Sequence, residues 1–235
     1  MEAGTDEQGG WEEEVQDLLL HGRDLEAAEL AVRHLRDHQP NEPPTQGAST
    51  MEPLEQLDEL GPLLGRVAGG IRPDQLDGPT PCAAFRVRDV LGHMIAGATL
   101  FAAGFRGEEA DPIEGDPAAG PDVVGRAGAA LGELIGAICS PGALDRPIAS
   151  PFGELSGEAF ARYLVLDGLV HGWDIASATG QRYEPSDELV AEADGYARGL
   201  LGPELRDGDT FALATEPPAG ATPIERLAAF TGRTV

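Results

Sequence analysis

The sequence predicts an all-α protein in which four helices form a bundle, with extra C-terminal helices and an acidic N-terminal extension. Two observations carry this prediction. Apolar residues recur at steps of three and four in successive segments, as they do along one face of an amphipathic helix. Stretches rich in glycine and proline separate these segments and mark where helices end. The chain also lacks the glycine fingerprint of a dinucleotide-binding α/β fold.

Composition and charge exclude several classes of function. The chain has 235 residues, which suits one sizeable domain with an appendage. Its formal net charge of −25 argues against nucleic acid or an anionic membrane surface as a partner. All 16 basic residues are arginines, which excludes a catalytic lysine of the Schiff-base or Walker type.

The sequence also favours a cytoplasmic location. No stretch approaches the roughly 18 uninterrupted apolar residues of a transmembrane helix. Residues 1–7 have neither the basic region nor the apolar region of a secretory signal. Two cysteines, Cys82 and Cys139, do not make a disulfide framework. We therefore expect a cytoplasmic protein with no membrane partner.

Residues 1–50 differ from the rest of the chain in charge. They hold 12 acidic residues and 3 arginines, a net charge of −9. An apolar stripe between Trp11 and His38 predicts one helix, and residues 39–50 have the composition of a linker. One interpretation is an acidic extension whose helix docks on a partner protein or on the main domain. The alternatives are a disordered tail, or a true start at Met51.

Residues 51–180 contain the four helices of the predicted bundle. Their apolar stripes place them at about residues 54–71, 87–105, 121–139 and 157–179. Residues 147–155 predict a small hairpin or a loop over one end of the bundle. Gly180 ends the fourth helix, because glycine is favoured just after a helix terminus. The C-terminal segment, residues 181–235, carries two shorter helices at about 186–201 and 222–231.

The fourth predicted helix carries a row of ionisable residues. Asp167 and His171 are four residues apart, so their side chains share one face of the helix, and Asp174 follows three residues later. Apolar residues surround most of this helix, which is typical of a buried helix. Buried ionisable groups are costly unless they are paired or bind a metal ion. Asp167 and His171 are therefore the first candidates for chemistry.

A histidine on the second predicted helix, His93, can complete a metal centre. Two ligands at i and i+4 and a third from a neighbouring helix suit a divalent metal that keeps one position open. Asp174 and Asp89 are candidates for holding an imidazole in the tautomer that binds the metal. The alternative is that Asp167 and His171 form a buried salt bridge or a hydrogen-bonded core pair without metal.

Two motifs lie on the second and fourth predicted helices. The first spans residues 77–97 and combines a turn, a cysteine, an aromatic residue and a helix bearing His93. The second spans residues 166–180 and contains Asp167 and His171. The two motifs, their order and the distance between them resemble those of the mycothiol-dependent maleylpyruvate isomerase N-terminal branch of the DinB-like superfamily. The resemblance covers the four predicted helices and the helix after them.

This resemblance implies a four-helix up-down-up-down bundle that holds a divalent metal, commonly zinc. The implied ligands in this chain are His93, Asp167 and His171. The resemblance also implies that some relatives use mycothiol, a low-molecular-weight thiol, as co-substrate. The sulfur of mycothiol could then take the open metal position as a thiolate.

The chain departs from the isomerase at three places. Asp167 stands where the isomerase has Glu, so the metal must lie nearer the helix backbone. Phe85 stands where many relatives have Trp. The residues after Gly180 are too few to match the second domain of the isomerase. The resemblance therefore supports the metal site more strongly than it supports the isomerase reaction.

Two hypotheses of function follow from the sequence. The first is a metal-dependent transferase or isomerase that activates the thiol of mycothiol toward a small electrophilic substrate. Hydrolysis by a metal-bound hydroxide is a variant of the same site. The second is a non-catalytic, metal-containing scaffold in which residues 1–50 dock a partner protein. A pocket beside the open metal position would favour the first hypothesis, and a closed site would favour the second.

Overall fold

The computed structural model describes residues 51–83, 85–150, 153–206 and 211–235. The predictions for residues 1–50, the acidic extension with its helix and linker, lie outside the described residues. The described part is dominated by α-helices, with one small two-stranded sheet, and this confirms the expected helical class. Within this part of the chain, no helix combines the length and the apolar character needed to cross a membrane.

All helices predicted between residues 51 and 235 are present, and their ends fall within about two residues of those predicted. The helices are α3 (Pro53–Gly69), α4 (Val87–Arg106), α5 (Val123–Ile138), α6 (Gly157–Thr179), α7 (Asp187–Leu200) and α8 (Pro223–Phe230). Short 3-10 turns lie at Pro73–Gln75 and Pro203–Leu205. The expected hairpin is formed by the antiparallel strands β1 (Pro147–Ser150) and β2 (Gly153–Ser156).

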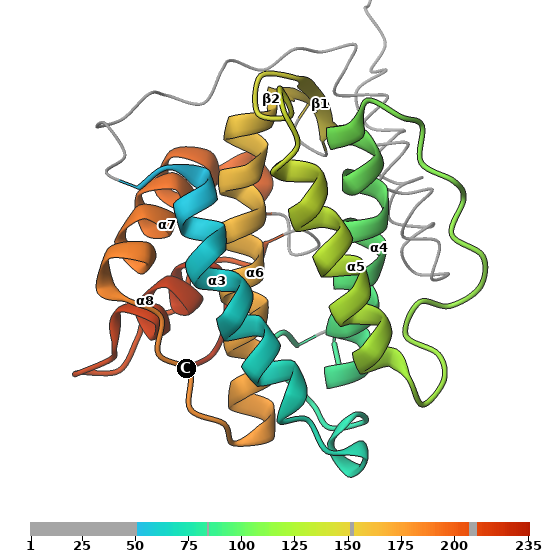
Figure 1. Ribbon diagram of the computed structural model, residues 1–235. Helices are drawn as coiled ribbons and strands as arrows, with labels where there is room; N and C mark the ends of the chain where they lie inside the picture. Colours follow the sequence, from blue (N-terminus) through green and yellow to red (C-terminus); the bar gives the residue numbers. More distant parts are fainter. Residues whose placement is uncertain (1–50, 84, 151–152, 207–210) are drawn as a thin grey trace, which may run out of the picture.

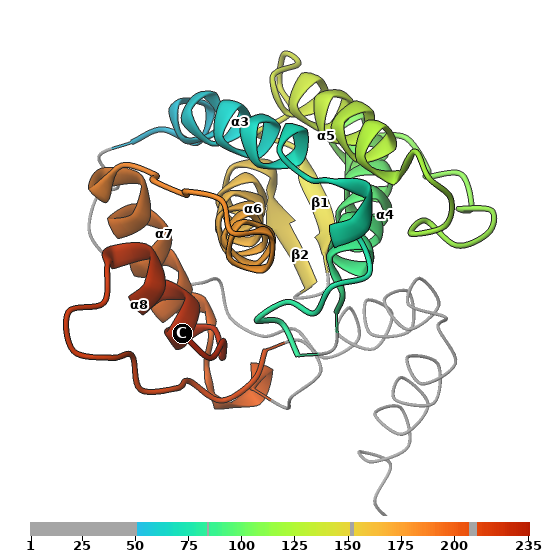
Figure 2. The same ribbon diagram turned by 90° about the horizontal axis from the view of Figure 1, so that it is seen from below.

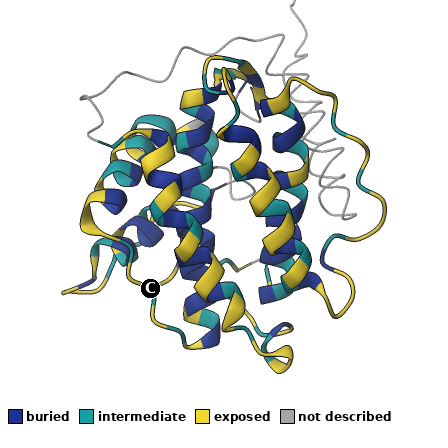
Figure 3. Ribbon diagram, viewed as in Figure 1, coloured by how far each residue is buried: buried dark blue, intermediate teal, exposed yellow. Residues whose placement is uncertain are grey.

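Four of these helices pack side by side (Figures 1 and 2). Helix α3 contacts α5 and α6, and helix α4 contacts the same two helices. Helices α7 and α8 pack on the outer side of α6, so α6 lies between the other three long helices and the C-terminal pair (Figure 2). The buried residues lie on the faces that the helices turn toward one another (Figure 3).

The chain directions differ from the predicted up-down-up-down order, because α4 and α5 run the same way (Figure 1). Near the start of both helices, Arg88 donates to the Ala118 carbonyl at 3.1 Å. Near their far ends, Arg106 pairs with Glu133 at 2.6 Å. The order is therefore down-up-up-down. The 20-residue α4 is about 30 Å long. Residues 107–122 form a connection long enough to run back along that length and reverse the expected direction of α5.

Helix α6 is the buried centre of the molecule, as its sequence predicts. The side-chain hydroxyl of Ser156 accepts a hydrogen bond from the Ala159 amide and caps the first turn. Gly180 ends the helix with φ of 70°, a left-handed conformation that glycine adopts at little cost. Between these ends, most residues of α6 are buried, including His171 and Asp174. The ionisable row predicted on this helix therefore lies inside the protein.

A pair of glycine substitutions tests the packing. A Cβ on Gly92 in α4 would lie 2.8 Å from Ala118 Cβ and 2.9 Å from the Ala118 backbone nitrogen. We expect Gly92→Ala to lower the free energy of unfolding by about 1–3 kcal/mol, because the connection before α5 must move. Gly136 in α5 is exposed and has nothing within 4 Å of such a Cβ. As the matched control, Gly136→Ala should raise stability by about 0.5–1 kcal/mol in urea unfolding.

Candidate metal centre

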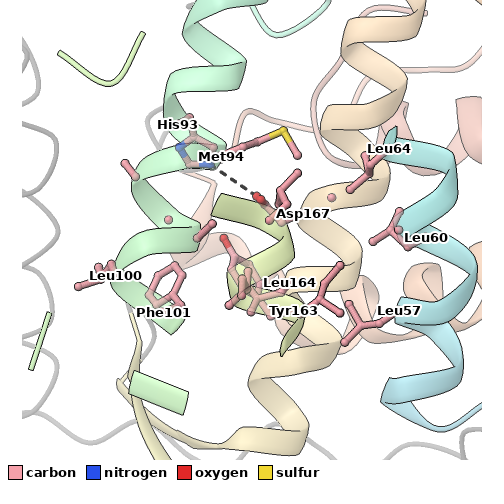
Figure 4. A pocket seen from close by; sticks show the side chains of 18 residues that line it. Leu57, Leu60, Leu64, His93, Met94, Leu100, Phe101, Tyr163, Leu164 and Asp167 are labelled. Carbon is pink, nitrogen blue, oxygen red and sulfur yellow. Dashed lines mark ion pairs between the residues drawn. The ribbon is translucent and has the colours of Figure 1, made fainter. Parts of the chain in front are cut away.

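The three predicted ligands come together between α4 and α6. His93 projects from α4, while Asp167 and His171 project from successive turns of α6. One potential ligand atom from each residue lies within 4.8 Å of the other two. Figure 4 shows His93 and Asp167 facing one another across the space between the helices. The i, i+4 spacing on one helix and a histidine on its neighbour thus produce one compact group of donors.

The distances within this group suit a bound ion better than direct hydrogen bonds. Asp167 Oδ1 lies 3.8 Å from His93 Nε2 and 3.5 Å from His171 Nε2. Hydrogen bonds between such groups are about 2.7–3.2 Å long. Two ligand atoms that are each about 2.1 Å from a tetrahedral zinc ion lie about 3.4 Å apart. The donor set, two imidazole nitrogens and one carboxylate oxygen, also fits a divalent ion.

Asp174 fixes the orientation of the His171 ring. Its Oδ2 atom lies 3.1 Å from His171 Nδ1, and its side chain is completely buried. With the proton of His171 on Nδ1, donated to Asp174, the lone pair on Nε2 is directed at Asp167. This is the arrangement by which carboxylates prepare imidazoles for metal binding. Asp89, the other residue considered for this role, instead accepts hydrogen bonds from the backbone and the guanidinium of Arg86.

A residue that the sequence did not indicate, Arg233, completes this network. Its guanidinium donates to Asp174 Oδ2 from Nη2 at 3.1 Å and from Nε at 3.3 Å. Arg233 follows α8 and is only 8% exposed. Burial lowers the pKa of Arg233, but the groups around it, chiefly the carboxylate of Asp174, together raise the pKa above its ordinary value. The two residues are 59 positions apart, so no local pattern could have linked them.

The centre is closed on one side and open on the other. The His171 side chain is 7% exposed, whereas those of Asp167 and His93 are 23% and 43% exposed. The Phe85 ring lies 5.8 Å from the His93 ring and 6.5 Å from the His171 ring, measured between centroids. An ion held by these donors would therefore have room for a further ligand on the side of His93 and Asp167.

Asp167 is an anionic group at neutral pH. Burial raises the pKa of this carboxyl, but the neighbouring imidazoles of His171 and His93 outweigh burial and lower the pKa to about 2. A carboxylate beside two imidazoles supplies one negative charge to a bound divalent ion. One net positive charge then remains to attract an anionic ligand such as a thiolate.

An apolar cavity of about 190 Å³ adjoins the open side of the centre. Side chains from α3, α4, α5 and α6 surround it, and His93 and Asp167 form part of its wall (Figure 4). The described residues thus form a packed group of helices with a cluster of nitrogen and oxygen donors beside an apolar cavity, and spaces between packed helices are common places for ligand and metal sites.

The chain belongs to the family of the mycothiol maleylpyruvate isomerase N-terminal domain, whose family model matches residues 57–176. This confirms the resemblance seen in the two motifs. The chain is also similar to two Mycobacterium tuberculosis proteins, from strains CDC 1551 / Oshkosh and ATCC 25618 / H37Rv, each described as uncharacterized. With each, it shares 35% identity over 189 residues, which cover 79% of this chain and the whole of the relative. No solved structure matches this chain.

A double-mutant cycle tests the buried pair of Asp174 and Arg233. Each single change, Asp174→Asn or Arg233→Met, should lower the free energy of unfolding by about 3–5 kcal/mol, because it leaves the other charge buried without its oppositely charged partner. The double variant should lose less stability than the sum of the two single losses, and the difference, the coupling energy, should be about 1–3 kcal/mol. The exposed pair of Asp194 and Arg198, 2.7 Å apart, is the control and should give a coupling below about 1 kcal/mol. Equal couplings for both pairs would contradict a structural role of Arg233.

Proposed function

We propose that this protein is a metal-dependent, thiol-using transferase or isomerase acting on a small electrophile. In this proposal, His93, Asp167 and His171 hold a divalent metal, zinc in the first instance, and mycothiol is the thiol. The observation that carries the proposal is the spacing of 3.5 and 3.8 Å between the carboxylate oxygen and the two imidazole nitrogens. The family description names mycothiol and maleylpyruvate isomerase, which supports the choice of thiol.

Each residue of the proposed site would have its own role. His93, Asp167 and His171 bind the metal, and Asp174 keeps the His171 ring in the required tautomer. A divalent ion in such a site lowers the pKa of a coordinated thiol or water. Phe85 and the apolar side chains of the cavity place low-polarity surface beside the donors, on the side where a substrate would approach.

The reaction balances without an oxidant or reductant. The thiol gives its proton to water, and the electron pair of the thiolate sulfur forms a bond to the electrophilic carbon. In a transferase, the leaving group departs with the electron pair of the broken bond. In an isomerase, attack of the sulfur on one carbon of a carbon–carbon double bond moves the π electrons onto the other carbon. The molecule then rotates about the resulting single bond. When the carbon–sulfur bond breaks, the double bond re-forms and the released thiolate takes up a proton, which regenerates the thiol.

The competing hypothesis, a non-catalytic metal-containing scaffold, draws less support from the described residues. A scaffold has no need of a space beside its metal, whereas the cavity here borders two of the three donors. The partner-docking part of that hypothesis concerns residues 1–50, which lie outside the described residues. Hydrolysis by a metal-bound hydroxide uses the same donors and is the nearest variant of the proposed reaction.

Metal content tests the ligand assignment. Protein purified without chelators or a histidine tag should contain about one divalent ion per chain, as measured by elemental mass spectrometry. His93→Ala and His171→Ala should each lose stoichiometric metal, because two donors do not retain an ion in competition with water. Asp174→Asn should remain partly loaded, since it removes a partner of a ligand and not a ligand. Asp187→Asn, at the start of α7, is the control and should be fully loaded.

Equal metal loading of His171→Ala and the parent protein would rule out the proposed centre.

Thiol chemistry is tested separately with mycothiol and 1-chloro-2,4-dinitrobenzene, whose chloride can be displaced by a thiolate. The metal-loaded protein should accelerate formation of the thioether, followed by absorbance. The His93→Ala variant should return to the rate of the uncatalysed reaction, because the thiol keeps its proton. A metal-loaded protein that accelerates neither this reaction nor the isomerisation of maleylpyruvate would argue for the scaffold hypothesis.

A further inference from the structure

We propose that the cavity between α3, α4, α5 and α6 binds an uncharged, largely apolar small molecule about the size of a substituted benzene ring. The molecule would place one polar group at the end of the cavity formed by His93, Asp167 and Tyr163. This proposal rests on the proposed function for the reaction, and it names the class of substrate that the site selects.

The cavity has the right size for such a ligand. Its volume is about 190 Å³. An engineered protein cavity of about 150 Å³ lined by apolar side chains stays dry and binds benzene. The space is partly open to solvent, so a small molecule can enter it, and it borders His93 and Asp167.

The walls of the cavity are chemically selective. Apolar side chains dominate them, among them Leu60, Met94, Phe101, Leu134 and Leu164. They come from all four packed helices. Figure 4 shows Leu60, Met94, Phe101 and Leu164 around the space between the helices. Among the described residues that line the cavity, the side chains with an ionisable group are those of His93, Asp167 and Tyr163, and none is an arginine.

Polar groups gather at one end of the cavity. Tyr163 lies one turn before Asp167 on α6, and Figure 4 shows its hydroxyl directed toward the end where Asp167 and His93 meet. A phenol hydroxyl can both donate and accept a hydrogen bond, so Tyr163 can bind a carbonyl or hydroxyl of the ligand at this end.

The arrangement disfavours a substrate with two carboxylates. A bound divalent ion could pair with one carboxylate, but the second would lie against apolar walls, where an unpaired charge is strongly penalised. The buried Arg233 is held by Asp174 and is not among the residues that line the cavity. Maleylpyruvate, the dicarboxylate named in the family description, is therefore a poor match for this cavity.

Three probes of suitable size test the selectivity of the cavity in the full-length protein as purified. Toluene is apolar, p-cresol adds one hydroxyl, and maleate is a dianion of similar size, with eight non-hydrogen atoms against seven and eight. Isothermal titration calorimetry should show saturable binding of toluene and p-cresol, each displacing the other. Maleate should leave the dissociation constant of toluene unchanged. Displacement of toluene by maleate, or the absence of toluene binding, would overturn the proposal.

Variants locate the binding site. Leu164→Phe fills the cavity and should weaken toluene binding by at least about 10-fold, since the added ring occupies the same volume. Leu213→Phe, at a residue that is 73% exposed, is the control and should bind as the parent does. If Leu164→Phe does not fold by circular dichroism, Leu131→Phe fills the same cavity from α5. Parent-like toluene binding in a folded cavity-filling variant would place the ligand elsewhere and overturn the proposal.

The polar end has its own test. Tyr163→Phe removes a single hydroxyl. It should raise the dissociation constant of p-cresol by about 10-fold, because a hydrogen bond is lost, and that of toluene by less than about 2-fold. Equal effects on both ligands would overturn the assignment of Tyr163.

Metal measured in the same samples separates this proposal from the proposed function. If the protein binds toluene but never contains metal, the proposed cavity site is supported and the proposed metal centre is rejected. If the protein contains metal but does not bind toluene, the metal centre is supported and the cavity site is rejected.

Discussion

The burial of Asp174 is the constraint on which much of the structure depends. This carboxylate is completely buried in α6, and a buried charge is tolerated only when it is paired and hydrogen-bonded. His171 supplies one partner from the same helix, and Arg233 supplies the other from the end of the chain. The segment after α8 must therefore reach the core for α6 to be buried. The C-terminal helices are thus a structural part of the site and not an addition to its outside.

Packing on the other sides of α6 determines where open space remains. Gly168 and Gly172 let α3 approach closely, because a Cβ on either would lie within 2.9 Å of a leucine side chain of α3. The cavity begins beside this contact, because Leu60 and Gly168 also form part of its lining, and it extends toward α4 and α5. His93 and Asp167 border this space and stay partly exposed, while His171 is enclosed.

Local sequence patterns predicted the parts of the protein that depend on local geometry. The helices, the end of α6 at Gly180 and the shared face of Asp167 and His171 follow from residue spacing and terminus preferences. The direction of α5 was predicted wrongly, because residues 107–122 have no pattern that reveals whether they turn back or cross over. Arg233 and the cavity could not be predicted, since both arise from contacts between distant segments. Asp89 was one of two candidates for orienting an imidazole, and in the structure its carboxylate pairs with Arg86.

The identity of residue 167 connects the metal centre with the cavity. An aspartate is one methylene shorter than the glutamate of the isomerase, so an ion bound here must lie closer to the backbone of α6. Asp174 holds the Nδ1 side of the His171 ring, and Arg233 in turn holds Asp174. His93 and Asp167, the two donors that stay partly exposed, also line the cavity. A ligand in the cavity would therefore lie next to these donors, inside the group of helices, and this agrees with the proposed substrate that is mainly apolar.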